Sequence, residues 1–270
     1  MLFKDTKCPN CDAYYDPTLL ECPSCHNSNE LFKINRLPKR VPFLHPGAQA
    51  GLFMAGFAYC GMLFSQFVFT LALYFAPWDE ILKQVIVLTL TYLAMFAGLI
   101  SIVLLTRREL FFKKFNSGVD YIYGVAYAVS IVAVGTILGS IISFFHDAGN
   151  NVNQTTAETI LTNYPILALF VLGILGPICE ELTYRVGLYS LLRRINKYLA
   201  FAVTTIVFAL IHFDFFASDM ISELWSLPTY LALGFLLTLA YEHRGPACSI
   251  IAHSVYNLIA CLLMLVKLYV

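Results

Sequence analysis

Seven long apolar runs fill the chain from about residue 48 to its end, and they constrain its fold more than any other feature. They cover residues 48–76, 84–105, 119–145, 164–191, 198–214, 226–241 and 246–266. A helix needs about 20 apolar residues to cross the hydrocarbon core of a bilayer. Only 13% of the 270 residues are charged, which is about half the share found in soluble domains. The sequence therefore predicts an all-α polytopic membrane protein with about seven transmembrane helices.

Lysine and arginine are distributed unevenly between the two ends of these predicted helices. The segment before the first run and the loops after the second, fourth and sixth runs hold 14 of the 17 basic residues. Loops rich in Lys and Arg stay on the cytoplasmic side, so we expect a cytoplasmic N-terminus and an external C-terminus, in a bacterial inner (plasma) membrane. The lipid bilayer is the first expected partner. The net charge of zero gives no reason to expect a nucleic-acid partner.

A polar head precedes the membrane part. We assign residues 1–36 to a small zinc-ribbon-like head in the cytoplasm, 37–47 to a linker that contains prolines, and 48–270 to the transmembrane domain. The head contains two C-P-x-C turns, which are made by four cysteines: Cys8, Cys11, Cys22 and Cys25.

Two such turns can bring four thiolates around one ion, and a four-cysteine zinc site supplies folding energy that a head this small cannot draw from a core. The alternative is two disulfides, which a reducing cytoplasm disfavours. Because four cysteines leave no open coordination position, we predict a structural zinc. The head is also a candidate contact surface for a cytoplasmic partner.

Ionisable side chains inside the apolar runs form the second informative group. Each costs about 2.5–3.5 kcal/mol on insertion scales and is a functional hypothesis by default. Glu181 and Arg185 are four residues apart and can pair on one helical face. Glu180 points about 100° away from Glu181, which leaves it without an obvious partner in its own helix.

Matching depth predicts which of these residues meet. Glu180, His212 and Asn257 lie 13, 15 and 13 residues from the nearest basic loop, which is roughly 20 Å in an unbroken helix. We therefore expect Glu180 and His212 to meet between antiparallel neighbours, with His253 one turn nearer the cytoplasm.

This set of side chains suits the attack of water on an amide bond. A carboxylate in apolar surroundings can act as a general base, a neighbouring imidazole can share the proton, and a second imidazole and a carboxamide can donate to an oxyanion. The same side chains could instead ligate zinc. Gly173, Gly176 and Pro177 either kink the helix to admit water or a peptide, or allow close helix packing.

At these residues the sequence resembles the CPBP family of membrane proteases, also called the Abi or type II CAAX-prenyl-endopeptidase family. Three motifs occur here in the family's order, E-E-x-x-x-R, F-x-x-x-H and H-x-x-x-N. They are formed by Glu180, Glu181 and Arg185, then Phe208 and His212, then His253 and Asn257. The resemblance covers residues 164–265.

The resemblance implies an all-helical intramembrane endopeptidase that acts on a membrane-associated peptide or protein. Glu180 would activate water with His212, and His253 with Asn257 would stabilise the oxyanion, while the other motif residues would hold the site together. The family has been described both as metalloproteases and as metal-independent glutamate proteases, and we favour a site without a catalytic metal. Two alternatives stay open: a non-catalytic membrane scaffold or bacteriocin-immunity protein with the same fold, and a proton-coupled transporter.

Overall fold

The computed structural model describes residues 6–16, 19, 21–27, 48–106, 111–112, 114–146 and 151–269. The predicted end of the head at residue 36 and the linker 37–47 lie outside these residues. From residue 48 onward the described chain is built of helices, which confirms the predicted fold class.

Six helical segments are long and apolar enough to cross a membrane. Five of them are single helices: α2 (Ala48–Leu73), α3 (Glu80–Thr106), α5 (Gly118–Phe145), α11 (Met220–Arg244) and α12 (Pro246–Tyr269). The sixth, Pro165–Arg193, is made of shorter pieces. A 3-10 turn, η1 (Lys114–Asn116), precedes α5, and the 12-residue helix α6 (Val152–Asn163) precedes the divided span.

The divided span changes its hydrogen-bond pattern twice. Its pieces are α7 (Pro165–Phe170), the π-helix η2 (Val171–Leu175), α8 (Gly176–Glu180), the π-helix η3 (Glu181–Tyr189) and α9 (Ser190–Arg193). At the end of η2 the N–H of Gly176 donates to the carbonyl of Val171, five residues back. Pro177 has no N–H with which to continue the ordinary helical ladder. Such π segments are frequent at functional sites.

The helices observed at the fifth and sixth predicted spans do not have the predicted lengths. The fifth run forms α10 (Lys197–Leu210), which has 14 residues and is therefore about 21 Å long, too short to cross the hydrocarbon core. It ends at a turn before the polar residues His212 and Asp214. The sixth run begins earlier than 226, because the carboxylate of Asp219 caps α11 by accepting from the N–H of Ser222 at 3.1 Å. Among the described residues, six candidate spans and one shorter apolar helix thus stand in place of the seven spans expected.

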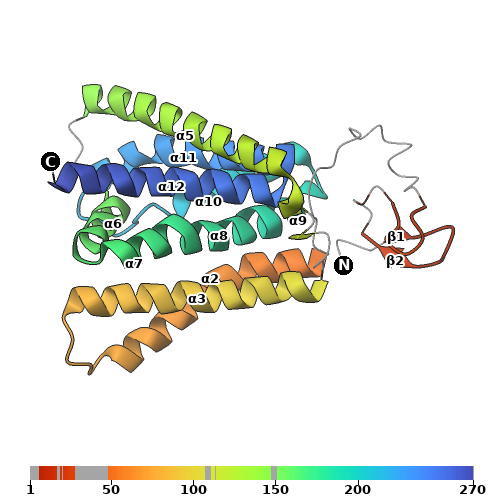
Figure 1. Cartoon of the computed structure of the whole chain (residues 1–270), viewed down its shortest axis with the longest axis horizontal. Coiled ribbons are helices and arrows are strands. Elements are labelled where there is room, and N and C mark those ends of the chain that lie inside the picture. Colours follow the sequence, from red (N-terminus) through yellow and green to blue (C-terminus); the bar gives the residue numbers. More distant parts are fainter. Residues whose placement is uncertain are drawn as a thin grey trace.

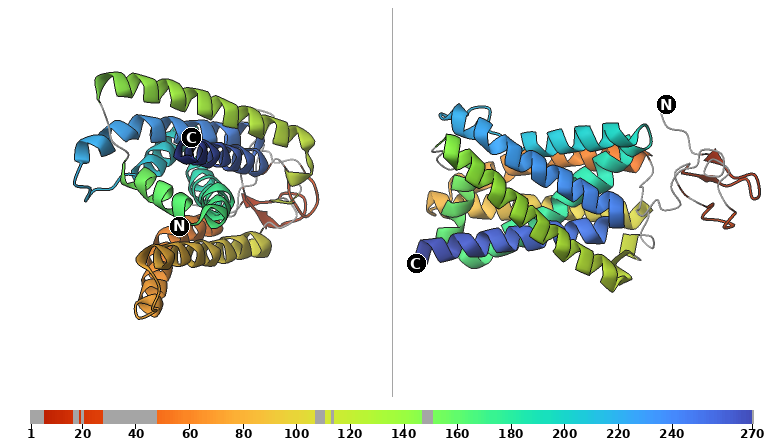
Figure 2. Two further views of the ribbon diagram at one scale, coloured as in Figure 1. Left: turned by 60° about the vertical axis from the view of Figure 1, so that its left-hand side comes forward. Right: turned by 90° about the horizontal axis from the view of Figure 1, so that it is seen from above.

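The divided span lies at the centre of the helical part. In its apolar window 56% of residues are buried inside the protein, against 7–33% for the other spans. Figure 1 shows it between the α2–α3 pair on one side and α5, α11 and α12 on the other. Figure 2 shows the head beyond one end of the helices and the C-terminus at the opposite end.

The head contains a two-stranded antiparallel sheet. Strand β1 (Thr6–Lys7) pairs with β2 (Tyr14–Tyr15), with Thr6 opposite Tyr15. The buried side chains beside it are Cys8, Tyr15 and Cys22.

Candidate active site

The two adjacent glutamates lie where the divided span changes its hydrogen-bond pattern. Glu180 ends α8 and Glu181 begins η3. The side chain of Glu181 is completely buried, whereas that of Glu180 is 15% exposed. Neighbours in sequence thus have different surroundings, which allows two carboxylates to serve different purposes.

Glu181 forms the ion pair that its spacing from Arg185 predicts. Nη1 of Arg185 donates to Oε1 of Glu181 at 2.7 Å, and neither side chain is exposed. Nη2 donates to the carbonyl of Gly234 in α11 at 3.1 Å. The guanidinium carbon also lies 4.3 Å from the centre of the Phe208 ring of α10. One arginine therefore joins three helical segments while neutralising a buried carboxylate.

His253 of α12 reaches both glutamates. Its Nδ1 lies 3.0 Å from Oε1 of Glu181, and because an ionised carboxylate only accepts, Nδ1 is the donor. Its Nε2 lies 3.8 Å from Oε2 of Glu180. The imidazole is only 2% exposed, so its position is fixed by these contacts and by the helices around it.

Glu180 has one carboxylate oxygen that accepts a hydrogen bond and one that does not. The hydroxyl of Tyr92, on α3, donates to Oε1 at 3.4 Å. Oε2 is buried and has no hydrogen-bond partner among the described residues. A buried polar atom of this kind is costly, and such costs are typical of functional sites.

His212 lies in the turn that follows α10, and Phe208 orients its ring. Nδ1 of His212 is 2.9 Å from the carbonyl oxygen of Phe208, which can only accept, so Nδ1 donates. In the neutral ring the accepting lone pair is then on Nε2. The Phe208 ring lies 4.9 Å from the ring of His212 and 5.8 Å from that of His253. The second motif therefore places its phenylalanine in contact with both imidazoles.

Asn257 binds the backbone of the divided span. Its Nδ2 donates to the carbonyl of Leu172 in η2 at 2.8 Å. Beside it, a Cβ added to Gly173 would lie 2.5 Å from Cδ2 of Leu258. The third motif thus holds η2 tightly against α12, which supports the close-packing interpretation of Gly173.

Two residues outside the motifs hold His212 in place, and the sequence did not predict either of them. The ring of Tyr230, on α11, stacks on the imidazole with centroids 4.6 Å apart and 19° between the planes. The Tyr230 hydroxyl accepts from Nδ2 of Asn151 and of Asn153 at 3.2 and 3.0 Å. No spacing rule links these segments, so only the fold brings them together.

Glu223 is the second support. It is 1% exposed, and its carboxylate accepts from the N–H of Asp214 at 3.2 Å and from that of Val152 at 2.8 Å. It therefore fixes the turn that carries His212. A carboxylate next to an apolar run was a usable signal in the sequence, but Glu223 precedes the run expected to begin at 226.

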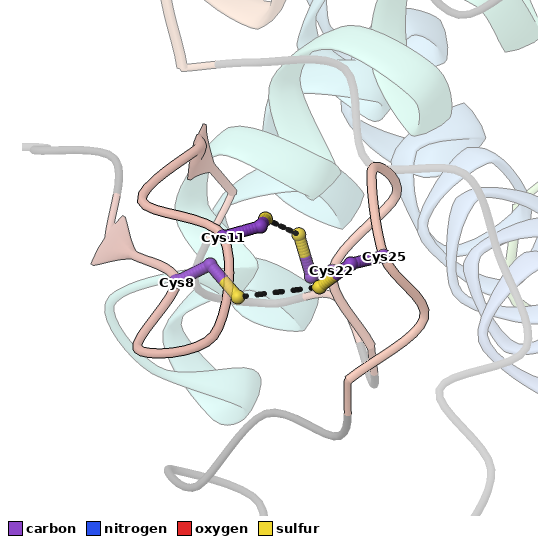
Figure 3. A group of neighbouring side chains, drawn as sticks. All are labelled: Cys8, Cys11, Cys22 and Cys25. Atoms are coloured by element: carbon purple, nitrogen blue, oxygen red, sulfur yellow. Dashed lines mark hydrogen bonds between the residues drawn. The ribbon is translucent and has the colours of Figure 1, made fainter.

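The four head cysteines form a second candidate site, a metal centre. Figure 3 shows their side chains directed toward one another. All four sulfurs lie within 4.8 Å of one another, with Sγ atoms of Cys8 and Cys25, and of Cys11 and Cys22, 3.6 Å apart. All eight cysteines of the chain are free thiols. The cluster could hold a metal ion such as zinc, whose structural sites use this ligand set.

The two C-P-x-C turns have the same backbone geometry. Asp12 N–H donates to the carbonyl of Cys8 at 3.0 Å, and His26 N–H donates to that of Cys22 at 2.8 Å. Both donors have positive φ, 59° for Asp12 and 57° for His26. The left-handed residue after each turn reverses the chain, so that both cysteines of a pair face the same point.

The pKa values of the cysteine thiols in the head differ from one another. A hydrogen bond from the Asn10 side chain, with the N–H of Asn27, lowers the pKa of Cys25 to about 6. The N–H of Ala13 lowers the pKa of Cys11, but hydrogen bonding to Cys25 and burial raise it to about 12. One thiolate is thus available near neutral pH, while another sulfur must lose a proton before it can bind a metal.

The head also contacts the membrane part. Asp16 pairs with Arg194, and both side chains are buried. Arg194 follows α9 directly, so this contact places the head at the end of the divided span that carries both glutamates.

Comparison with known proteins finds a match over the region that contains the three motifs. Residues 162–259 match the family model described as type II CAAX prenyl endopeptidase Rce1-like. This match confirms the resemblance. The CAAX-endopeptidase-like region contains all three motifs, and with the six apolar helices it indicates an integral membrane protein.

Two curated relatives show how far the similarity extends. The UPF0177 protein YxdF of Lactococcus lactis subsp. lactis is 35% identical over 108 residues, which are 39% of this chain and 55% of that protein. An uncharacterized protein of Mycoplasma capricolum subsp. capricolum is 27% identical over 171 residues, 58% of this chain and 48% of that protein. The chain therefore spans about half the length of the curated relatives it matches. No solved structure matches the chain.

Proposed function

We propose that the protein is an intramembrane endopeptidase in which Glu180 activates the water that attacks the peptide bond. The observation that carries this proposal is the different environment of the two glutamates. Glu181 is engaged by Arg185 and His253 through the same oxygen. Oε2 of each glutamate is buried without a hydrogen-bond partner among the described residues, but Glu180 is 15% exposed whereas Glu181 is 0% exposed. Glu180 is therefore the carboxylate that can accept a proton from a bound water.

The two histidines would take different parts. His212 donates through Nδ1 to the carbonyl of Phe208, which leaves Nε2 of the neutral ring to accept from the same water. His253 donates through Nδ1 to Glu181, so Nε2 of the neutral ring is an acceptor. In the imidazolium form Nε2 would also donate, to the developing oxyanion or to Glu180. Asn257 would act by fixing η2, since its amide donates to Leu172.

We propose that no catalytic metal takes part. The proposal is supported by the contacts of Glu181, whose Oε1 accepts from both Arg185 and His253. In the head we propose a structural zinc, because four cysteines make a closed coordination set.

We also propose a bacterial inner-membrane location with the head in the cytoplasm. Lys197 begins α10 and Arg244 ends α11. In Figure 1 the head and the C-terminus lie at opposite ends of the helical part. Basic residues favour the cytoplasmic side. Labelling from outside the cell of a cysteine introduced in the head would contradict this orientation.

The function is tested by Glu180→Gln and His212→Ala in purified protein, reconstituted with a set of fluorogenic membrane-anchored peptides and assayed with and without chelator. We expect wild-type protein to cleave and both variants to lose at least about 100-fold, the usual contribution of a general base. Glu21→Gln, whose side chain lies in the head and is 58% exposed, is the matched control and should cleave normally.

Full cleavage by Glu180→Gln would refute the assigned base. Inhibition by chelator that persists after the four head cysteines are replaced would indicate a catalytic metal. A cellular phenotype that depends on the folded protein, with no cleavage of any substrate, would favour the scaffold function.

A further inference from the structure

A cavity of about 800 Å³ lies between α2, α3 and α6. Figure 1 shows the second half of α2 diverging from α3 on this side of the molecule. The cavity is therefore placed at the outer surface of the helical part and not inside the bundle of α5, α11 and α12.

The cavity and the candidate active site share Tyr92. Its side chain lines the cavity, and its hydroxyl donates to Oε1 of Glu180 at 3.4 Å. A molecule that fills the cavity would thus contact a residue that orients the proposed base.

The cavity wall is more polar than a lipid-facing surface requires. The residues that can exchange hydrogen bonds with a ligand include Gln66, Thr70, Gln84, Thr91, Tyr92 and Thr156. Polar side chains within a membrane-spanning segment are costly and mark substrate pathways.

Thr91 is the decisive residue of this wall. It is 3% exposed, and its hydroxyl has no hydrogen-bond partner among the described residues. Two residues earlier on the same helix, the hydroxyl of Thr89 donates to the carbonyl of Val85 at 2.7 Å, which is the ordinary way to satisfy a threonine in a helix. Thr91 thus lines the cavity and has a hydroxyl that no described residue engages.

We propose that this cavity binds an unwound segment of a membrane-inserted peptide and presents it to Glu180. The inference rests on the proposed function, since the peptide would be the substrate. A helical substrate satisfies its own backbone, but an extended one in the bilayer must find partners in the protein. Glutamine amides and threonine hydroxyls both donate and accept, as a peptide backbone requires. The volume lies within the range of ligand pockets, about 300–1,000 Å³.

The test measures binding and not cleavage, in full-length Glu180→Gln protein in phosphatidylcholine nanodiscs. The probe is a fluorescent Leu/Ala transmembrane peptide with a central Pro-Gly break, and the same peptide without the break is the reference. We expect the broken peptide to bind more tightly than the reference. Thr91→Val, which keeps the side-chain volume and removes the hydroxyl, should weaken that binding about fivefold, the effect of one hydrogen bond.

Thr89→Val is the matched control, because it lies on the same helix but does not line the cavity, and it should leave binding unchanged. Equal binding of the broken peptide to Thr91→Val and to the parent would overturn the proposal. A photoactivatable group beside the break should label α2 or α3, and labelling confined to other helices would also overturn it.

A lipid is the rival occupant of the cavity. If a photoactivatable phospholipid labels Gln66 and Thr70 and the broken peptide does not compete with it, the cavity is a lipid site and the proposal fails. Because the assay needs no cleavage, a protein that binds the broken peptide yet cleaves nothing would contradict the proposed function alone.

Discussion

Nε2 of His253 approaches Oε2 of Glu180 to 3.8 Å, while Nδ1 of the same ring bonds Glu181. Adjacent residues of a helix point about 100° apart, so a residue of the same helix can contact one of the two glutamates but not both. An imidazole from a neighbouring helix reaches both because its two nitrogens lie on different sides of the ring. His253 thereby connects Glu180, the proposed base, to the buried ion pair of Glu181 and Arg185.

The buried pair predicts a large loss of stability when one partner is removed. Arg185→Met should lower the free energy of unfolding by about 3–5 kcal/mol, because Glu181 would remain buried without its cation. The double variant Glu181→Gln, Arg185→Met should be less destabilised than Arg185→Met. Thermal and denaturant unfolding in detergent measure both.

The comparison for this measurement is the pair of Lys83 and Glu80, with 2.8 Å between Nζ and Oε1, in which the carboxylate is 79% exposed. Breaking it with Lys83→Met should cost about 0–1 kcal/mol. Similar losses for Lys83→Met and Arg185→Met would contradict the view that Arg185 maintains the site.

Tyr230 predicts a positioning effect on His212. Tyr230→Leu removes the stacked ring, which contributes about 0.5–1.5 kcal/mol in such pairs, and should lower kcat/KM up to about tenfold. Tyr230→Phe keeps the stack, loses only the bonds from Asn151 and Asn153, and should lose less. The pH profile should shift in Tyr230→Leu, because the environment of His212 changes.

Tyr198→Leu is the control for that series, since Tyr198 is 80% exposed. If Tyr230→Leu has the pH profile of the wild type and lowers only the yield of folded protein, Tyr230 has a structural role alone.

Much of the helical part follows from the sequence for a simple reason: insertion in a bilayer requires long apolar helices, and these are visible as runs. The exception is the fifth run. Hydropathy alone does not separate the 14-residue α10 from the turn that follows it, so the apolar residues around His212 were counted as helix. Likewise, Glu181 and Arg185 are four residues apart on one helix, and their pairing needs no knowledge of the fold.

The contacts between helices could not be predicted in the same way. The depth argument counts residues along unbroken helices, but η2 and η3 each widen the turn and change which direction a side chain faces. Counting along unbroken helices therefore predicts a contact between Glu180 and His212, but it does not predict that His253 contacts both glutamates. Tyr92 carries no motif on α3, and only the packing of α3 against α8 reveals its bond to Glu180.

Gly173 predicts a steric effect that a glycine with open space around it, such as Gly139, would not show. A Cβ there would lie 2.5 Å from Cδ2 of Leu258, so Gly173→Ala should destabilise the protein by about 1–3 kcal/mol through overpacking. Gly139→Ala in α5, where nothing lies within 4 Å of the added Cβ, should be neutral or slightly stabilising. Adding Leu258→Ala should restore part of the loss. Equal stability of the two glycine variants would show that η2 can move away from α12.

The last prediction concerns the metal and pH. Zinc binds thiolates, so its affinity for the head should rise with pH, and binding should release protons. Because the pKa of Cys25 in the metal-free head is lowered to about 6, protons compete with zinc for its thiolate only below that value, and zinc affinity should fall more steeply with pH there. The pKa of Cys11 is raised to about 12, so at neutral pH zinc binding must displace its proton.

Zinc content and proton release on adding zinc to chelator-treated protein measure this directly. We expect about one zinc per chain, the content of one closed four-cysteine site, and its loss in Cys22→Ser. Cys60→Ser is the matched control, since Cys60 is an exposed thiol of α2 far from the cluster in sequence, and it should keep the metal. Disulfides in protein isolated under native conditions, or zinc retained in Cys22→Ser, would contradict a four-cysteine metal site. If the head influences the site through Asp16 and Arg194, chelation should lower activity only while that contact is intact, so Asp16→Asn should make activity insensitive to chelator.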